Sequence, residues 1–222
     1  YVLGKALNLQ NCHVESLKRE YDLSSGVTYR KIHYTYEGFD FYLVEEKIVS
    51  SKHPLLYAVN VKLSSPNFDG EVQLKSYLKA SHKLHKVGSD PRVQDHDYHF
   101  DYVDVDPKKQ TVTVKTNQSK LQLSCRMVHN KSFACYKKDH DLISVRMEKL
   151  SSNKVITIEK LIVYQTELYS DFIVTDSDLK TISFDSLRNE ETKRLTTFWS
   201  HSKFTFLKNK EIENIINYNI FQ

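Results

Sequence analysis

The residues 95–106, DHDYHFDYVDVD, form the densest run of acidic and histidine side chains in the sequence. In a β-strand alternate side chains share a face, so the first half of this run would gather carboxylates and an imidazole on one face. Such groups, spaced two residues apart, can share a metal ion, and two further histidines precede the run. The candidate metal ligands are His82, His85, Asp97, His99 and Asp101.

An acidic strand face exposed to solvent explains the same run without a metal. Such a face discourages pairing with the strands of other molecules. No motif such as H-E-x-x-H supports a metal, and the calcium-loop pattern fails because the glycine of its sharp turn is absent. We therefore favour the exposed face, which could dock a basic partner, and expect no cofactor.

Three cysteines leave two interpretations open. Cys125 and Cys135 flank nine residues that contain a turn signal at Asn130, so a symmetric hairpin would place the two cysteines opposite each other at disulfide distance. A disulfide would indicate an oxidising compartment, whereas two reduced cysteines would be small apolar core residues. Cys12 is then left over. The spacing of the three does not resemble a zinc site.

Two glycosylation sequons, at Asn117 and Asn130, fall at expected turns. A sequence with this content of Asn, Ser and Thr contains about two such matches by chance, so the count carries little weight. The localisation stays open, and the candidate disulfide favours a secreted protein over a cytosolic one.

Composition excludes several classes of function. The 222 residues include 5 Gly and 4 Pro, and the sequence contains no G-x-G-x-x-G, no P-loop and no G-x-S-x-G motif. The net charge of +4 is too small to indicate a nucleic-acid partner. No apolar run approaches the 18 or so residues that span a bilayer, so we expect no membrane span.

Short segments with period-two alternation, separated by turn signals, predict most of the secondary structure. Two segments predict helices instead: 13–22 near the N-terminus, and the C-terminal fifth, with helical spacing at 187–198 and 212–220. The expected strands are 27–36, 39–49, 55–63, 71–85, 97–106, 111–116, 121–127, 133–138, 142–149, 155–164, 168–175 and a short one at 203–207.

These elements predict a mainly β (α+β) fold. Consecutive strands joined by short turns form antiparallel pairs, because a parallel pair needs a long crossover. We expect an antiparallel meander of about nine to eleven strands, forming a sandwich or a barrel, with a short N-terminal helix and C-terminal helices. The chain would be one domain over 1–222, with a candidate split into two subdomains near 86–95, where Gly88 and Pro91 lie in a turn-rich stretch.

Fourteen tyrosines suggest where a partner could bind, because tyrosine combines a large rigid surface with a polar tip. Three hypotheses follow. The first is a non-enzymatic binding protein with a Tyr-rich surface for a protein partner. The second is a β-barrel or clam that carries a small apolar ligand, and the third is a metal-dependent enzyme built on the histidine and aspartate cluster. The candidate partner-binding residues are Tyr29, Tyr34, Tyr36, Tyr98 and Tyr102.

Overall fold

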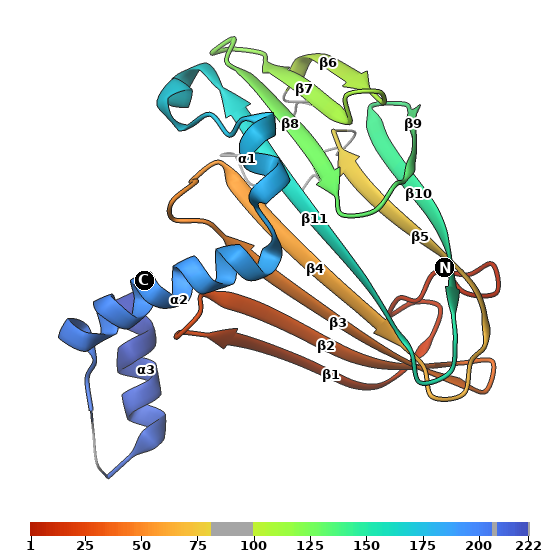
Figure 1. The fold of residues 1–222 in the computed structure, drawn as a ribbon, viewed down its shortest axis with the longest axis horizontal. Helices are drawn as coiled ribbons and strands as arrows, with labels where there is room; N and C mark the ends of the chain where they lie inside the picture. The colour runs from red at the N-terminus through yellow and green to blue at the C-terminus, as the bar shows by residue number, and fades with distance from the viewer. Residues whose placement is uncertain (81–99, 206–207, 222) are drawn as a thin grey trace, which may run out of the picture.

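The computed structural model describes residues 1–80, 100–205 and 208–221, which form two packed antiparallel β-sheets and a C-terminal group of helices (Figure 1). The larger sheet has eight strands in the order β1-β2-β3-β4-β11-β8-β7-β6, and the smaller has three in the order β5-β10-β9. The predicted mainly β fold with C-terminal helices is therefore confirmed, and the sheets form a sandwich. The proposed split near 86–95 lies outside the described residues.

The large sheet consists of β1 (His13–Asp22), β2 (Val27–Tyr36), β3 (Phe39–Val49), β4 (Leu56–Ser64), β6 (Phe100–Asp106), β7 (Thr111–Thr116), β8 (Gln122–His129) and β11 (Val155–Thr166). The small sheet consists of β5 (Gly70–Lys79), β9 (Ala134–Lys138) and β10 (Asp141–Leu150). After β11 come the 3-10 helix η1 (Glu167–Phe172) and the α-helices α1 (Asp176–Thr181), α2 (Phe184–Ser202) and α3 (Lys210–Phe221).

Both faces of the large sheet are covered in part, which explains why its central strands carry apolar residues on two sides. On one face, residues such as Phe41 and Leu63 pack against Val72 and Leu150 of the small sheet. A second cluster between the sheets forms around Met127. On the other face, a separate set of apolar side chains packs against the helices: Ile48, Leu56, Ala58, Leu161 and Val163 contact Val174, Phe184 and Leu187.

The helices begin at well-formed caps. Thr175 and Asp178 form a reciprocal capping box at the start of α1, and Ser183 and Ser186 form one at the start of α2. Each box satisfies backbone N–H groups that a helix leaves free in its first turn. None of the described helices is long and apolar enough to span a membrane.

The predicted N-terminal helix is wrong, because residues 13–22 form β1. Val14, Leu17 and Tyr21 have helical spacing, but the segment pairs along its length with β2. β1 is an edge strand with most side chains exposed, so it lacks the apolar alternation that marks a half-buried strand. The hydrogen bonds to β2 outweigh the local preference, which is weak for a segment of this length.

Two predicted hairpin pairings and two predicted strands are also wrong. One of these strands is the short one expected at 203–207, because residues 203–205, its described part, form no strand. Strand β8 pairs with β7 and β11, whereas β9 pairs with β10 in the small sheet. Strands β10 and β11 likewise belong to different sheets, so each of these turns carries the chain from one sheet to the other. The segment expected as a strand at 168–175 forms η1 instead, where the Thr166 hydroxyl accepts a hydrogen bond from the Leu168 N–H.

Of the two interpretations left open for Cys125 and Cys135, the structure has the reduced pair, because the hairpin between β8 and β9 on which the candidate disulfide depended is not formed. Cys125 lies opposite Val112 and Tyr164 in the large sheet. Cys135 lies opposite Ser144 in the small sheet. Both thiols are free, as is that of Cys12.

Candidate functional site

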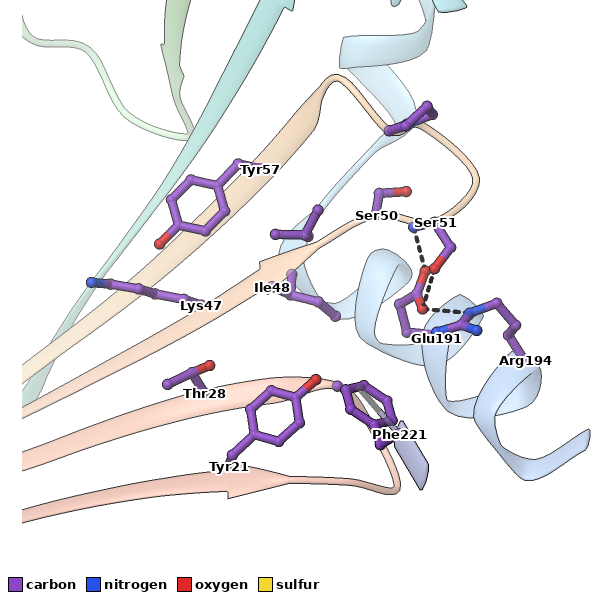
Figure 2. Close-up of a pocket in the computed structure, with 13 residues that line it drawn as sticks. Tyr21, Thr28, Lys47, Ile48, Ser50, Ser51, Tyr57, Glu191, Arg194 and Phe221 are labelled. Carbon is purple, nitrogen blue, oxygen red and sulfur yellow. Dashed lines mark hydrogen bonds and ion pairs between the residues drawn. The ribbon is translucent and has the colours of Figure 1, made fainter. Parts of the chain in front are cut away.

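A pocket of about 380 Å³ lies at one end of the large sheet, where strands β1 to β4 meet α2 and the end of α3 (Figure 2). Ligand pockets in proteins are typically clefts of about 300–1,000 Å³ with mostly apolar walls and a few polar groups. This pocket fits that description. Its lining residues are Tyr21, Gly26, Thr28, Lys47, Ile48, Val49, Ser50, Ser51, Pro54, Tyr57, Glu191, Arg194 and Phe221.

The strand register places a row of polar side chains along one wall of the pocket. Tyr21 of β1 lies opposite Thr28 of β2, which in turn lies opposite Lys47 of β3. Residues directly opposite each other in antiparallel strands point to the same face, about 5 Å apart. Tyr57 of β4 pairs with Val49, two residues beyond Lys47, and completes the row.

The opposite wall of the pocket contains a buried carboxylate, that of Glu191 on α2. Glu191 Oε1 accepts a hydrogen bond of 2.6 Å from the Ser51 backbone N–H, and Oε2 accepts one of 2.8 Å from the Ser51 hydroxyl (Figure 2). Arg194 Nε donates to the same Oε2 at 2.9 Å. Burial by itself would raise the pKa of Glu191, but the hydrogen bonds from Ser51 and Arg194 together outweigh it and lower the pKa. The carboxylate therefore stays ionised near neutral pH.

Aromatic rings close the end of the pocket. The ring of Phe221, in α3, lies 5.3 Å from that of Tyr21 between centroids, and Trp199 of α2 stacks near Phe221 at 6.2 Å. Trp199 Nε1 donates a 2.7 Å hydrogen bond to the Leu23 carbonyl, which ties α2 to the turn after β1. Burial raises the pKa of Tyr57 to about 12, so its phenol remains protonated and can donate a hydrogen bond.

A second cavity, of about 290 Å³, opens between the two sheets. Lys160 of β11 lines it and donates a 3.0 Å hydrogen bond to the Tyr77 carbonyl of β5, so its side chain bridges the sheets. Burial lowers the pKa of Lys160 to about 8, and burial together with that ammonium lowers the pKa of His129 to about 4. Within the described residues neither ring nitrogen of His129 has a hydrogen-bond partner.

The candidate metal ligands remain untested. His82, His85, Asp97 and His99 lie outside the described residues, and the side chain of Asp101, on β6, is not described either. Elsewhere in the described chain no group of three His, Cys, Asp or Glu side chains is arranged to hold a metal ion.

The candidate partner-binding tyrosines do not form one surface. Tyr34 is buried between the sheets and Tyr36 packs against the same cluster, whereas Tyr29 packs against the cluster under the helices. Tyr102 is 52% exposed, and Tyr98 lies outside the described residues. The pocket uses Tyr21 and Tyr57, neither of which was singled out from the sequence.

The two sequon asparagines lie at turns, as expected. Asn117 follows β7. Asn130 follows β8, where its Oδ1 accepts a 3.0 Å hydrogen bond from the Glu159 N–H. The Asn130 side chain therefore holds the turn against β11.

The two-sheet antiparallel sandwich, with a C-terminal group of helices at one end of the larger sheet (Figure 1), defines the class of the chain as a β-sandwich domain. The family described as glycosyl hydrolase family 65, N-terminal domain, matches residues 1–198. The chain therefore belongs to the family of glycosyl hydrolase family 65 N-terminal domains.

A solved structure shares this fold. A putative kojibiose phosphorylase from the human microbiome aligns with a TM-score of 0.83 at 19% sequence identity, over 97% of this chain and 29% of its own. At this identity the similarity establishes the shared fold, and the chain spans less than a third of that protein. A heparan sulfate lyase, HepC from Pedobacter heparinus, aligns over 70% of this chain and 23% of its own at 9% identity, with a TM-score of 0.36 that supports no argument. No curated protein matches the chain.

The family membership corrects the functional hypotheses drawn from the sequence. The chain is related to domains of glycoside-processing enzymes, so the hypothesis of a non-enzymatic binding protein is wrong. The same family membership also argues against the two alternative hypotheses, a carrier of a small apolar ligand and a metal-dependent enzyme. None of the short motifs considered in the sequence points to this family, whose model matches the chain over residues 1–198 as a whole.

Proposed function

We propose that the chain is the N-terminal β-sandwich domain of a larger carbohydrate-active enzyme, a glycoside phosphorylase or glycoside hydrolase. One observation carries the proposal: the family match covers residues 1–198. The superposition of almost the whole chain on part of a putative kojibiose phosphorylase is in keeping with it. In this proposal the enzyme acts on glycosidic bonds between sugars such as those of kojibiose.

The chemistry of the pocket supports placing bond cleavage elsewhere in that enzyme. Hydrolysis of a glycosidic bond typically uses two carboxyl groups on either side of it, one of which must carry a proton. Glu191 is the only carboxyl residue that lines the described pocket, and its lowered pKa keeps it ionised. Its oxygens are already occupied by Ser51 and Arg194. Glu191 therefore serves to hold α2 rather than to donate a proton.

Exposed apolar side chains support a role within a larger protein. On α3, Ile212 and Ile215 are 44% and 56% exposed, whereas Glu213 and Asn217 of the same helix are buried. The short helix η1 also exposes apolar side chains, namely Leu168, Tyr169 and Phe172. Apolar groups left in solvent in this way commonly mark surfaces that another domain covers. In our proposal the remainder of the enzyme covers them.

A comparison of two proteins tests the proposal. The 222-residue chain and the longer protein that contains it are each incubated with kojibiose, with and without inorganic phosphate. We expect the longer protein to cleave the sugar and the chain alone to be inactive. Dependence on phosphate, with release of a sugar phosphate, would identify a phosphorylase, and cleavage without phosphate a hydrolase. Cleavage by the chain alone, or failure of the longer protein on a panel of glycosides, would contradict the proposal.

A further inference from the structure

We infer that the pocket beneath α2 is a binding site for a neutral carbohydrate, a site separate from the one that cleaves the bond. The inference rests on the proposed function, because it takes the class of ligand from a glycoside-processing enzyme. The geometry that supports it is the row of polar groups on β1 to β4, the aromatic end and the charge balance of the walls.

The polar row presents hydroxyl groups that the protein itself does not use. Among the described residues, no hydrogen bond engages the side-chain hydroxyls of Tyr21, Thr28 and Tyr57. Each hydroxyl can donate one hydrogen bond and accept others. Tyr21 and Thr28 stand on the adjacent strands β1 and β2, and Tyr57 stands on β4, beyond β3. Neighbouring strand backbones lie about 5 Å apart, so the positions from which these side chains project are fixed before a ligand arrives. A sugar, which carries a hydroxyl on most of its carbons, matches such a series.

The aromatic rings supply the second element of sugar recognition. A pyranose ring has an apolar face made of C–H groups, which packs well on the face of an aromatic ring. Tyr21 and Phe221 stand together at one end of the pocket, and Tyr57 stands across from them (Figure 2). Tyrosine contributes both an apolar face and a polar tip at one position. The pocket therefore offers stacking and hydrogen bonding from the same side chains.

The charges in the walls favour a neutral ligand over an anion. Lys47 Nζ pairs with Glu45 at 2.6 Å, and Arg194 Nε pairs with Glu191 at 2.9 Å. Each cation that lines the pocket thus already has a carboxylate partner, and the walls carry little net charge. A phosphate or sulfate would need unpaired donors and an excess of positive charge. A neutral sugar can bind between the two ion pairs without disturbing either of them.

Titrations of the 222-residue chain test this site. Glucose, maltose and inorganic phosphate are added separately, and binding is followed by calorimetry and by the fluorescence of Trp199, the only tryptophan, which lies against Phe221. We expect at least one of the two sugars to bind with a Kd below about 10 mM, and phosphate not to bind. No saturable binding of either sugar, or binding of phosphate in place of sugar, overturns the inference.

Three conservative variants and a control show where the sugar binds. Tyr21→Phe, Thr28→Val and Tyr57→Phe each remove one hydroxyl and keep the shape of the side chain. Each is expected to weaken sugar binding by about three- to tenfold, which is the loss of one hydrogen bond. Tyr136→Phe, at an exposed tyrosine on β9 outside the pocket, should leave binding unchanged.

The outcome separates this inference from the proposed function. If all three variants bind sugar as tightly as the parent chain, the ligand lies elsewhere and the inference is wrong. Thermal unfolding of each variant checks that the fold is retained. We expect it to be retained, because each substitution only removes a hydroxyl or replaces it by a methyl group of similar size. A chain that binds no sugar leaves the proposed function intact, since the longer protein can still cleave glycosides at its own catalytic site.

Discussion

Glu191 and Ser51 join α2 to the large sheet, although 140 residues separate them in the sequence. The Glu191 carboxylate caps the loop between β3 and β4 through the backbone N–H and the hydroxyl of Ser51. Arg194, one turn further along α2, binds the same carboxylate. This contact sets the distance between α2 and the strand ends, and with it the width of the pocket.

We predict that Glu191→Gln destabilises the chain by about 1–3 kcal/mol at pH 7, because hydrogen bonds to a buried ionised group are among the stronger ones. The measurement is urea-induced unfolding followed by circular dichroism. Glu190→Gln is the matched control, since Glu190 pairs with Lys52 on the surface and an exposed ion pair contributes little. Equal effects of the two variants would show that the Ser51 contact does not hold the helix.

The same contact predicts a dependence of stability on pH. Because folding lowers the pKa of Glu191, the folded state favours the carboxylate. The unfolded state therefore binds more protons as the pH falls below the ordinary value of about 4.5 towards the lowered one, and stability is lost over that range. The stability difference between the parent chain and Glu191→Gln should accordingly shrink on acidification. A difference that stays constant between pH 7 and pH 3 would contradict this.

Lys160 also makes stability rise with pH, but here the substitution is expected to stabilise the chain. Its folded pKa of about 8 lies below the ordinary value of 10.5, so between these values the unfolded chain holds a proton that the folded chain has released. Stability should rise with pH over this interval. At pH 7 the buried ammonium is charged and costs free energy. Lys160→Met should therefore stabilise the chain there by about 1–2 kcal/mol, after the loss of the bond to the Tyr77 carbonyl.

The pH profile separates this effect from simple packing. The advantage of Lys160→Met over the parent should decline as the pH rises from 8 to 10.5, and unfolding curves at several pH values measure it. Lys154→Met, at an exposed position on the turn before β11, should shift stability little at any pH. A Lys160→Met variant that is less stable than the parent at pH 7 would show that the hydrogen bond to Tyr77 outweighs the buried charge.

The sequence was sufficient to predict most strands but not the sheet to which each belongs. Alternation such as that of β4 arises from burial of a face, and it is visible within a few residues. The partner of a strand depends on tertiary contacts. The turn at Asn130 and the turn at Asn153 both look like hairpin connections, yet each links a strand of one sheet to a strand of the other. Edge strand β1 shows the same limit, because its pairing with β2 overrides its helical spacing.

The pocket could not be predicted from the sequence for a related reason. Its residues come mainly from four strands near the N-terminus and from two helices near the C-terminus, and no local spacing connects Tyr21 or Lys47 with Glu191. The run at 95–106 stands out in the sequence because its acidic and histidine side chains all lie in one short segment. The pocket instead gathers ordinary residues by strand register, which only the fold supplies.

The three cysteines allow a direct check that β8 and β9 belong to different sheets and do not form a hairpin. Thiol titration of the unfolded, unreduced chain should find three free thiols. In the folded chain, burial raises the pKa of Cys125 to about 11, so only a very small fraction is thiolate at pH 8. Alkylation with iodoacetamide, followed by peptide mass spectrometry, should therefore label Cys125 at least about tenfold more slowly than in the unfolded chain. A Cys125–Cys135 peptide cross-link would contradict the observed separation of these residues into two sheets.

Gly70 and Gly38 should both resist substitution by alanine, for different reasons. A Cβ at Gly70 would lie 2.7 Å from the ring of Phe68, which is buried against Phe39 and Phe41. We expect Gly70→Ala to lower the free energy of unfolding by about 1–3 kcal/mol through overpacking.

Gly38 has open space around it but a φ of +80°, so Gly38→Ala should lower the free energy of unfolding by about 1–2 kcal/mol through backbone strain. Urea unfolding of both variants measures these losses.

A second substitution distinguishes the two causes. Combining Gly70→Ala with Phe68→Leu makes room for the new methyl group, so the two changes together should cost less than the sum of their separate effects. At Gly38, replacement by Asn should be tolerated better than replacement by Ala, because asparagine adopts a positive φ more readily. If Phe68→Leu gives no relief at Gly70, the backbone at the start of β5 can move away from the ring, and the tight packing between Gly70 and Phe68 does not limit this position.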